Sequence, residues 1–231
     1  MSVINALKAT IARQHPTLRR LCPSGQAAAG WAVVAAACGT GCGHTPPAPA
    51  AARHLYVGLD VSGSAQGQKA DFLAATVGVA EGLSPDDDKV TLLRLDRDTR
   101  EFYDDPVRDT SLFATVLAEE TTRPNPQSRT LPAPFWQAVA ERAEADGGAV
   151  WVCLLSDGDN DDLRPASWDD MARAAARLAR NPHVRAVVIA GARPENWAQL
   201  RQCFGPLGAR LHLLPPGQVK TDPLAASLGL P

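Results

Sequence analysis

Three oxygen-bearing side chains stand at alternate positions in the stretch Leu-Tyr-Val-Gly-Leu-Asp-Val-Ser-Gly-Ser, residues 55–64. The stretch begins as an apolar run and then places Asp60, Ser62 and Ser64 two residues apart. Because successive side chains of an extended segment point to opposite faces, these three face the same side. A carboxylate and two hydroxyls, without His or Cys, suit a hard cation such as Mg²⁺ or Mn²⁺ better than zinc.

A second group of oxygen-bearing residues, Ser156-Asp157-Gly158, follows the apolar run at 149–155. If the two runs form neighbouring parallel strands, Asp157 lies beside Asp60. A loop containing Thr130 precedes a predicted helix and supplies a further hydroxyl. An ordinary strand-to-turn exit also uses Asp, Ser and Gly, but the second group favours a metal site. Further along the acidic loop, Asp159, Asp161 and Asp162 are predicted to be solvated rather than ligands.

Apolar runs and helical patterns alternate along the rest of the chain, and they must position these residues. Strands are predicted at 55–61, 89–95, 149–155, 184–190 and 210–214, with a short edge strand at 101–103. The run at 55–61 is continuously apolar, which is typical of a strand covered on both faces. Helices are predicted at 67–82, 110–120, 134–145, from Ser167 onward and at 196–204. This alternation predicts an α/β fold, a Rossmann-like, doubly wound, mostly parallel sheet with helices on both faces. In such sheets ligands bind at the carboxyl ends of the strands, where Asp60 and Asp157 stand.

The motifs together resemble the von Willebrand factor A domain and its metal-ion-dependent adhesion site. Asp-x-Ser-x-Ser at 60–64, a loop threonine at 130 and Ser-Asp-Gly at 156–158 occur in the order of that family. The resemblance covers residues 54 to about 214. The chain departs from the family at the loop, where Arg129 stands before Thr130 and prolines lie on both sides, so Ser128 is an alternative ligand.

The resemblance implies a role for each residue of the motif. Ser62 and Ser64 would bind the metal directly, and Thr130 would bind it directly in one state of the domain. Asp60 and Asp157 would bind it mostly through water. One coordination position would stay open for a carboxylate, usually an Asp or Glu of a partner protein.

The first part of the chain has a different composition from the rest. Asp and Glu are absent before Asp60, whereas basic residues such as Arg19 and Arg20 occur there. An apolar stretch at 27–37, too short to cross a bilayer, then ends at Ala-Ala-Ala-Cys38. This pattern predicts a secretory signal, and its end resembles the lipobox of bacterial lipoproteins. Cys38 is the expected lipidated residue, with Cys42 as a second candidate; an uncleaved anchor or a disordered Ala-rich leader is the alternative.

Four segments follow from this reading. Residues 1–37 are a signal segment, 38–53 a Pro/Ala-rich tether, 54–216 the von Willebrand factor A-like domain and 217–231 a peripheral C-terminal tail. The sequence therefore predicts an exported protein tethered to the membrane through a lipid only. A cytoplasmic location is the alternative.

Composition limits the function. The 231 residues are 45% hydrophobic and carry a net charge of −2, which suits a globular chain and provides no basic surface for nucleic acid. A Walker A sequence, a Gly-x-Ser-x-Gly elbow and a convincing general base are missing from the sequence. We therefore expect a binding module, not an enzyme. The alternatives are a cytoplasmic subunit of an ATPase- or chelatase-type complex and, with less support, a metal-dependent hydrolase.

Overall fold

The computed structural model describes residues 52–95, 98–123, 129–162, 164 and 166–230. The predicted signal segment, the candidate lipidation residues Cys38 and Cys42, and Ser128 lie outside these ranges. Within the described ranges, the helices are all too short or too polar to cross a membrane.

A single six-stranded sheet forms the centre of the domain, with the strand order β3-β2-β1-β4-β5-β6. All neighbouring pairs are parallel except β2 and β3, which are antiparallel. The strands are β1 (Arg53–Asp60), β2 (Lys89–Leu95), β3 (Arg100–Asp105), β4 (Ala149–Leu155), β5 (Val184–Ala190) and β6 (Leu211–Leu214). The predicted fold class, an α/β fold with a mostly parallel sheet, is confirmed.

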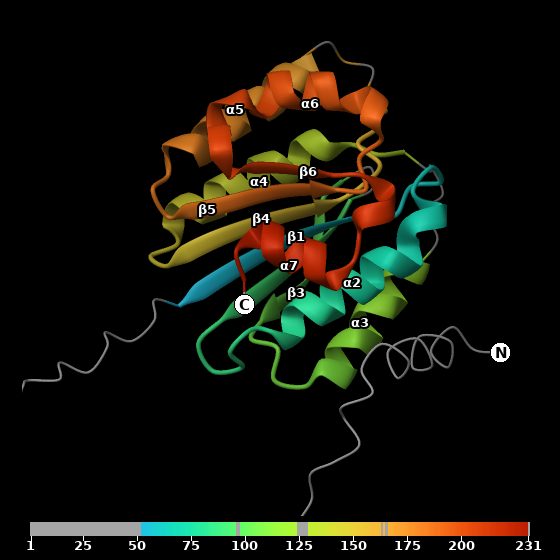
Figure 1. The fold of residues 1–231 in the computed structure, drawn as a ribbon, viewed down its shortest axis with the longest axis vertical. Coiled ribbons are helices and arrows are strands. Elements are labelled where there is room, and N and C mark those ends of the chain that lie inside the picture. Colours follow the sequence, from blue (N-terminus) through green and yellow to red (C-terminus); the bar gives the residue numbers. More distant parts are fainter. Residues whose placement is uncertain (1–51, 96–97, 124–128, 163, 165, 231) are drawn as a thin grey trace, which may run out of the picture. The chain divides into compact units, whose positions relative to one another are not determined.

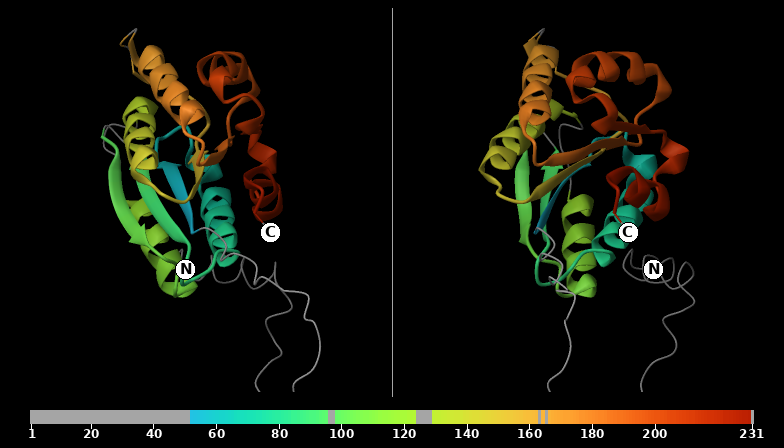
Figure 2. Two further views of the ribbon diagram at one scale, coloured as in Figure 1. Left: turned by 90° about the vertical axis from the view of Figure 1, so that its left-hand side faces the viewer. Right: turned by 60° about the vertical axis from the view of Figure 1, so that its left-hand side comes forward.

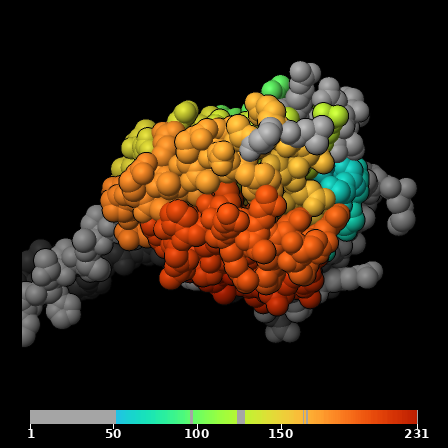
Figure 3. Space-filling model, turned by 90° about the horizontal axis from the view of Figure 1, so that it is seen from above, coloured from blue at the N-terminus to red at the C-terminus, as the bar shows by residue number. Residues whose placement is uncertain are grey.

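Helices cover both faces of this sheet (Figures 1 and 2). On one face α2, α3 and α7 lie together, and on the other α4, α5 and α6 lie together. Viewed from above, α5 lies beside the orange-red segment that includes α6 (Figure 3). The helices are α2 (Lys69–Glu81), α3 (Thr110–Thr122), α4 (Pro132–Ala145), α5 (Ala166–Arg180), α6 (Trp197–Phe204) and α7 (Thr221–Leu228). Short 3₁₀ helices are η2 (Gln66–Gln68), η3 (Pro194–Asn196), η4 (Gly205–Arg210) and η5 (Pro216–Gln218).

The central strands are apolar because both of their faces are covered. In β1 and β4, for example, Leu59 and Leu155 are almost fully buried. Gly58 of β1 makes room for α4, since a Cβ there would lie 2.7 Å from the ring of Phe135. Phe135 and Trp136 continue this contact as an aromatic cluster with Phe204 of α6. The cluster fixes α4, and with it the loop that carries Thr130, against the sheet.

The structure differs from two predicted segment boundaries. Arg53, expected in the tether, begins β1 and pairs with the buried Asp88. The predicted tail contains α7, whose Leu224 and Leu228 are buried and which packs against α2 and β5. The compact unit therefore continues well beyond residue 216.

Candidate metal centre

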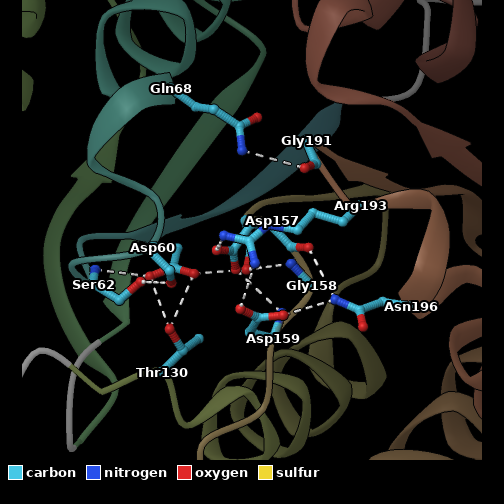
Figure 4. A network of polar contacts seen from close by, with 12 residues as sticks. Asp60, Ser62, Gln68, Thr130, Asp157, Gly158, Asp159, Gly191, Arg193 and Asn196 are labelled. Atoms are coloured by element: carbon cyan, nitrogen blue, oxygen red, sulfur yellow. Dashed lines mark hydrogen bonds and ion pairs between the residues drawn. The ribbon is translucent and has the colours of Figure 1, made fainter.

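Three loops meet at the carboxyl edge of the sheet and bring the predicted ligands together (Figure 4). Asp60 ends β1 and is followed by the turn with Ser62 and Ser64, while Asp157 follows β4. Strands β1 and β4 are hydrogen-bonded neighbours, with Leu59 opposite Leu155. The expectation that Asp60 and Asp157 stand beside each other is thus confirmed. Thr130 reaches the same edge from the loop before α4.

Asp60 is the centre of the hydrogen-bond network. Its Oδ1 accepts the backbone N–H of Ser62 at 2.8 Å, and its Oδ2 accepts the hydroxyl of Ser156 at 2.7 Å. The hydroxyl of Thr130 lies 3.2 Å from each carboxylate oxygen. Asp60 stands at the carboxyl end of its strand, as expected, and it is 1% exposed, because the loops after β1 and β4 and before α4 close over it.

The environment of Asp60 disfavours its charged form. Burial raises the pKa of Asp60, the hydrogen bonds from Ser156 and Ser62 oppose this effect, and the nearby charge of Asp157 raises the pKa further. A divalent cation at this edge would offset the cost of holding two carboxylates close together.

The two serines of the motif differ in exposure. Ser62 is fully buried, whereas Ser64 is exposed, and their hydroxyl oxygens lie 3.1 Å apart. Two hydroxyls this close can act as neighbouring ligands of one cation. The pair therefore spans from the interior of the site to its surface.

Thr130 is held in place by the acidic loop after β4. The N–H of Thr130 donates to the carboxylate of Asp161 at 2.7 Å, and the N–H of Asp161 donates to the carbonyl of Thr130 at 3.0 Å. Asp161 is exposed, as predicted, but it also supports a candidate ligand. The hydroxyl of Thr130 points at Asp60, so the Arg129 that precedes it does not displace it from the site.

Asp157 is fully buried and its two oxygens have separate partners. Oδ1 accepts the N–H of Asp159 at 3.1 Å, and Oδ2 accepts Nη2 of Arg193 at 3.1 Å. Gly158, with φ of +82°, turns the chain sharply after Asp157, a conformation that favours glycine. Its N–H donates to the hydroxyl of Ser156 at 3.1 Å, which fixes the start of the loop.

The donor set fits a hard cation. It offers three hydroxyls and two carboxylates from Asp60, Ser62, Ser64, Thr130 and Asp157, all oxygen atoms. In the described part of the chain, His, Cys, Asp and Glu do not gather in groups of three that could hold a metal. Mg²⁺ prefers oxygen ligands and retains several waters, so hydroxyls and water-bridged carboxylates suit it.

Comparisons with known proteins rest on structure alone, because no protein-family model and no curated protein sequence matches the chain. A von Willebrand factor type A protein from Catenulispora acidiphila superposes with a TM-score of 0.58 at 14% identity, over 77% of this chain and 42% of that chain. An aerotolerance-related membrane protein from Bacteroides fragilis gives a TM-score of 0.52 at 13% identity, over 77% and 96% of the two chains. The manganese-loaded TRAP protein of Plasmodium vivax gives 0.55 at 16% identity, over 77% and 73%.

The chain has the von Willebrand factor A fold. It spans between 42% and 61% of the length of the first three matching structures, so it matches only part of each of those chains. At these identities the likeness shows the fold of this chain and not its ligand.

The sequence did not predict the contacts of the loop after β5. Arg193 and Asn196 join this loop to the loop after β4, since Asn196 donates to the carboxylate of Asp159 at 2.8 Å. A signal was present, because Gly-Ala-Arg-Pro at 191–194 directly follows a predicted buried strand. Residues in that position must lie at the same edge of a parallel sheet as Asp60 and Asp157.

Proposed function

We propose that this von Willebrand factor A domain is a metal-dependent protein-binding module with an adhesion-type site. Ser62 and Ser64 would bind Mg²⁺ or Mn²⁺ directly, Thr130 would bind it directly in one state, and Asp60 and Asp157 would act mostly through water. The observation that carries the proposal is the meeting of these five residues at one edge of the sheet, with Asp60 hydrogen-bonded to Ser62 and Thr130.

The expected partner is a protein that presents an Asp or Glu side chain. A cation whose direct ligands are mostly neutral hydroxyls keeps much of its positive charge. An incoming carboxylate at an open coordination position is therefore attracted to it. The exposure of Ser64 supports this arrangement, because it gives a partner a route to the cation from solvent.

The test is a titration of Mn²⁺ into the chain and into the Ser64→Ala variant. Asp60→Ala is a poor test, because it would leave the donors of Ser62, Thr130 and Ser156 without their acceptor inside the domain. Ser64 is exposed, and the hydrogen bond described for its side chain joins it to Ser62, so its loss should leave the fold intact. We expect Ser64→Ala to weaken Mn²⁺ binding at least about tenfold, as the loss of one direct ligand would.

The matched control is Ser111→Ala, which removes an exposed serine hydroxyl from α3. It should bind Mn²⁺ like the wild type. Equal affinity of Ser64→Ala and the wild type would reject the adhesion-type site.

Binding is favoured over catalysis by the surroundings of the proposed cation. Two acidic side chains of the loop after β4 are held in structural contacts: Asp159 with Arg193 and Asn196, and Asp161 with Thr130.

We further propose that the protein is exported and held at the membrane by a lipid on Cys38. This proposal depends on the sequence before residue 52 alone, where the apolar stretch at 27–37 ends at that cysteine. The partner would then be met in the cell envelope.

A further inference from the structure

Arg193 places a positive charge directly on a carboxylate of the candidate metal site. Its Nη2 lies 3.1 Å from Oδ2 of Asp157, and its Nη1 lies 3.3 Å from Oδ2 of Asp159 (Figure 4). The Asp157 side chain is 0% exposed, whereas the Arg193 side chain is 39% exposed. Since an isolated buried carboxylate is costly, Arg193 supplies the counter-charge that Asp157 needs within the domain.

A divalent cation bound to this site would meet the same carboxylate. Two cations that share one carboxylate repel each other, so the interaction of each with Asp157 weakens when the other is present. The Arg193 side chain is partly exposed and would be hydrated on leaving, whereas the Asp157 side chain is fully buried. Competition for Asp157 would therefore displace the arginine and not the carboxylate.

The loop that carries Arg193 is anchored by contacts that do not involve the guanidinium. The N–H of Arg193 donates to the carbonyl of Asp157 at 2.9 Å, and Asn196 donates to the same carbonyl at 3.3 Å. The indole of Trp197 donates to the carbonyl of Ala192 at 3.0 Å. The side chain can consequently swing away while the backbone between β5 and α6 stays in place.

We propose that the guanidinium of Arg193 is the counter-cation of the Asp157 carboxylate when no metal is bound. A divalent cation that binds the site displaces this guanidinium, so Arg193 lowers the affinity of the site for the cation. The inference rests on the proposed function and adds a residue from a loop outside the adhesion motif.

The first measurement is a Mn²⁺ titration of the full chain, followed by the electron paramagnetic resonance signal of free Mn²⁺. Arg193→Gln removes the charge and keeps a polar side chain, and it should tighten Mn²⁺ binding about tenfold, equivalent to about 1.4 kcal/mol. Arg193→Lys keeps the positive charge but replaces the planar guanidinium with an ammonium group, and it should bind Mn²⁺ nearly as the wild type does. Asn196→Ala loosens the same loop without changing its charge and should not tighten binding.

The second measurement is the melting temperature with a chelator and with saturating Mg²⁺. With the chelator Arg193→Gln should melt below the wild type, because Asp157 has lost its counter-charge. Mg²⁺ should raise the melting temperature of this variant by more than it raises that of the wild type, because a ligand that binds the folded state more tightly stabilises it more at the same concentration.

The outcomes separate this inference from the proposed function. If Ser64→Ala weakens Mn²⁺ binding but Arg193→Gln binds Mn²⁺ no tighter than the wild type, the adhesion-type site stands and the counter-cation role is rejected. If neither the wild type nor Arg193→Gln binds Mn²⁺, both are rejected. If Arg193→Gln binds and the wild type does not, the inference is supported in its strongest form. Arg193→Met, also uncharged, repeats the test should the Gln variant fail to fold.

Discussion

At the scale of single residues, Asp88 is a buried carboxylate that joins the starts of two neighbouring strands. It precedes β2, and its Oδ1 accepts the backbone N–H of Arg53, the first residue of β1, at 3.1 Å. Its Oδ2 accepts Nε of Arg53 at 2.8 Å and the N–H of Ser84 at 2.7 Å. Burial opposes the charge of Asp88, but these hydrogen bonds and the charge of Arg53 outweigh it and lower its pKa.

We predict that Asp88→Asn lowers the free energy of unfolding at pH 7 by about 2 kcal/mol, the typical worth of hydrogen bonds to a charged group. The pKa of Asp88 is lower in the folded than in the unfolded state, where it is about 3.9. Its stabilisation is therefore complete above that value and is lost as the pH falls through the folded pKa. Urea unfolding of both proteins at a series of pH values should show the difference shrinking in acid.

The control for this prediction is Asp86→Asn, which neutralises an exposed carboxylate two residues away. It should change the stability little at any pH. A stability difference between Asp88→Asn and the wild type that is the same at pH 7 and in acid would contradict the role of the charge.

Spacing along the chain was enough to predict some of the site residues and not others. Asp60, Ser62 and Ser64 were predicted from the alternation of an extended segment, but the strand ends at Asp60 and the turn after it brings the two serines together. Asp157 follows from its place after a buried strand. The roles of Arg193 and Asp161 were not predicted, because an ion pair with Asp157 and a backbone contact with Thr130 depend on how loops fold over one another.

At the scale of elements, Gly58 controls how closely α4 approaches the sheet. A Cβ at this position would lie 2.7 Å from Cε2 of Phe135 and 2.9 Å from Cδ1 of Leu95. Phe135 is fully buried, so its ring has little room to move. We predict that Gly58→Ala lowers the free energy of unfolding by about 1–3 kcal/mol, the usual cost of overpacking a core.

Because α4 follows the Thr130 loop directly, Gly58→Ala should also weaken Mn²⁺ binding. Denaturant unfolding and the Mn²⁺ titration measure the two effects. Gly205→Ala serves as the control, since a Cβ there meets nothing within 4 Å. Equal stability of the two variants would show that α4 is not held at this distance by Gly58.

The central strands could be predicted because burial on both faces produces unbroken apolar runs. The helix α7 was not predicted, because it is short and depends on a contact made at long range. A Cβ at Gly78 of α2 would lie 2.2 Å from Oγ1 of Thr221, which begins α7. A close approach of this kind leaves little trace in the sequence around residue 221.

At the scale of the whole molecule, the strand order places the candidate site at a switch point. The chain builds β2 and β3 on one side of β1 and then crosses to build β4, β5 and β6 on the other. Loops after β1 and β4 therefore diverge at the middle of the sheet and leave room for a ligand between them. The alternation of strands and helices was sufficient to predict the parallel sheet, but its strand order was visible only in the structure.

The proposed attachment to the membrane can be tested in a bacterial host by cell fractionation. We predict that Cys38→Ala moves the chain from the membrane fraction to the soluble fraction and that Cys42→Ala does not. The mass of the N-terminal peptide would identify the modified residue. Release by Cys42→Ala but not by Cys38→Ala would show that the second cysteine carries the lipid, and retention of both single variants would argue against a lipid anchor on one defined cysteine.

The direction of β1 has a consequence for how the domain could be presented to a partner. The strand runs for eight residues, from Arg53 to Asp60, and so it carries the chain about 25 Å from one edge of the sheet to the other. Arg53, the first residue of β1, therefore lies at the edge of the sheet opposite Asp60. A partner that reaches the candidate site meets the end of the domain that is farthest from the start of its first strand.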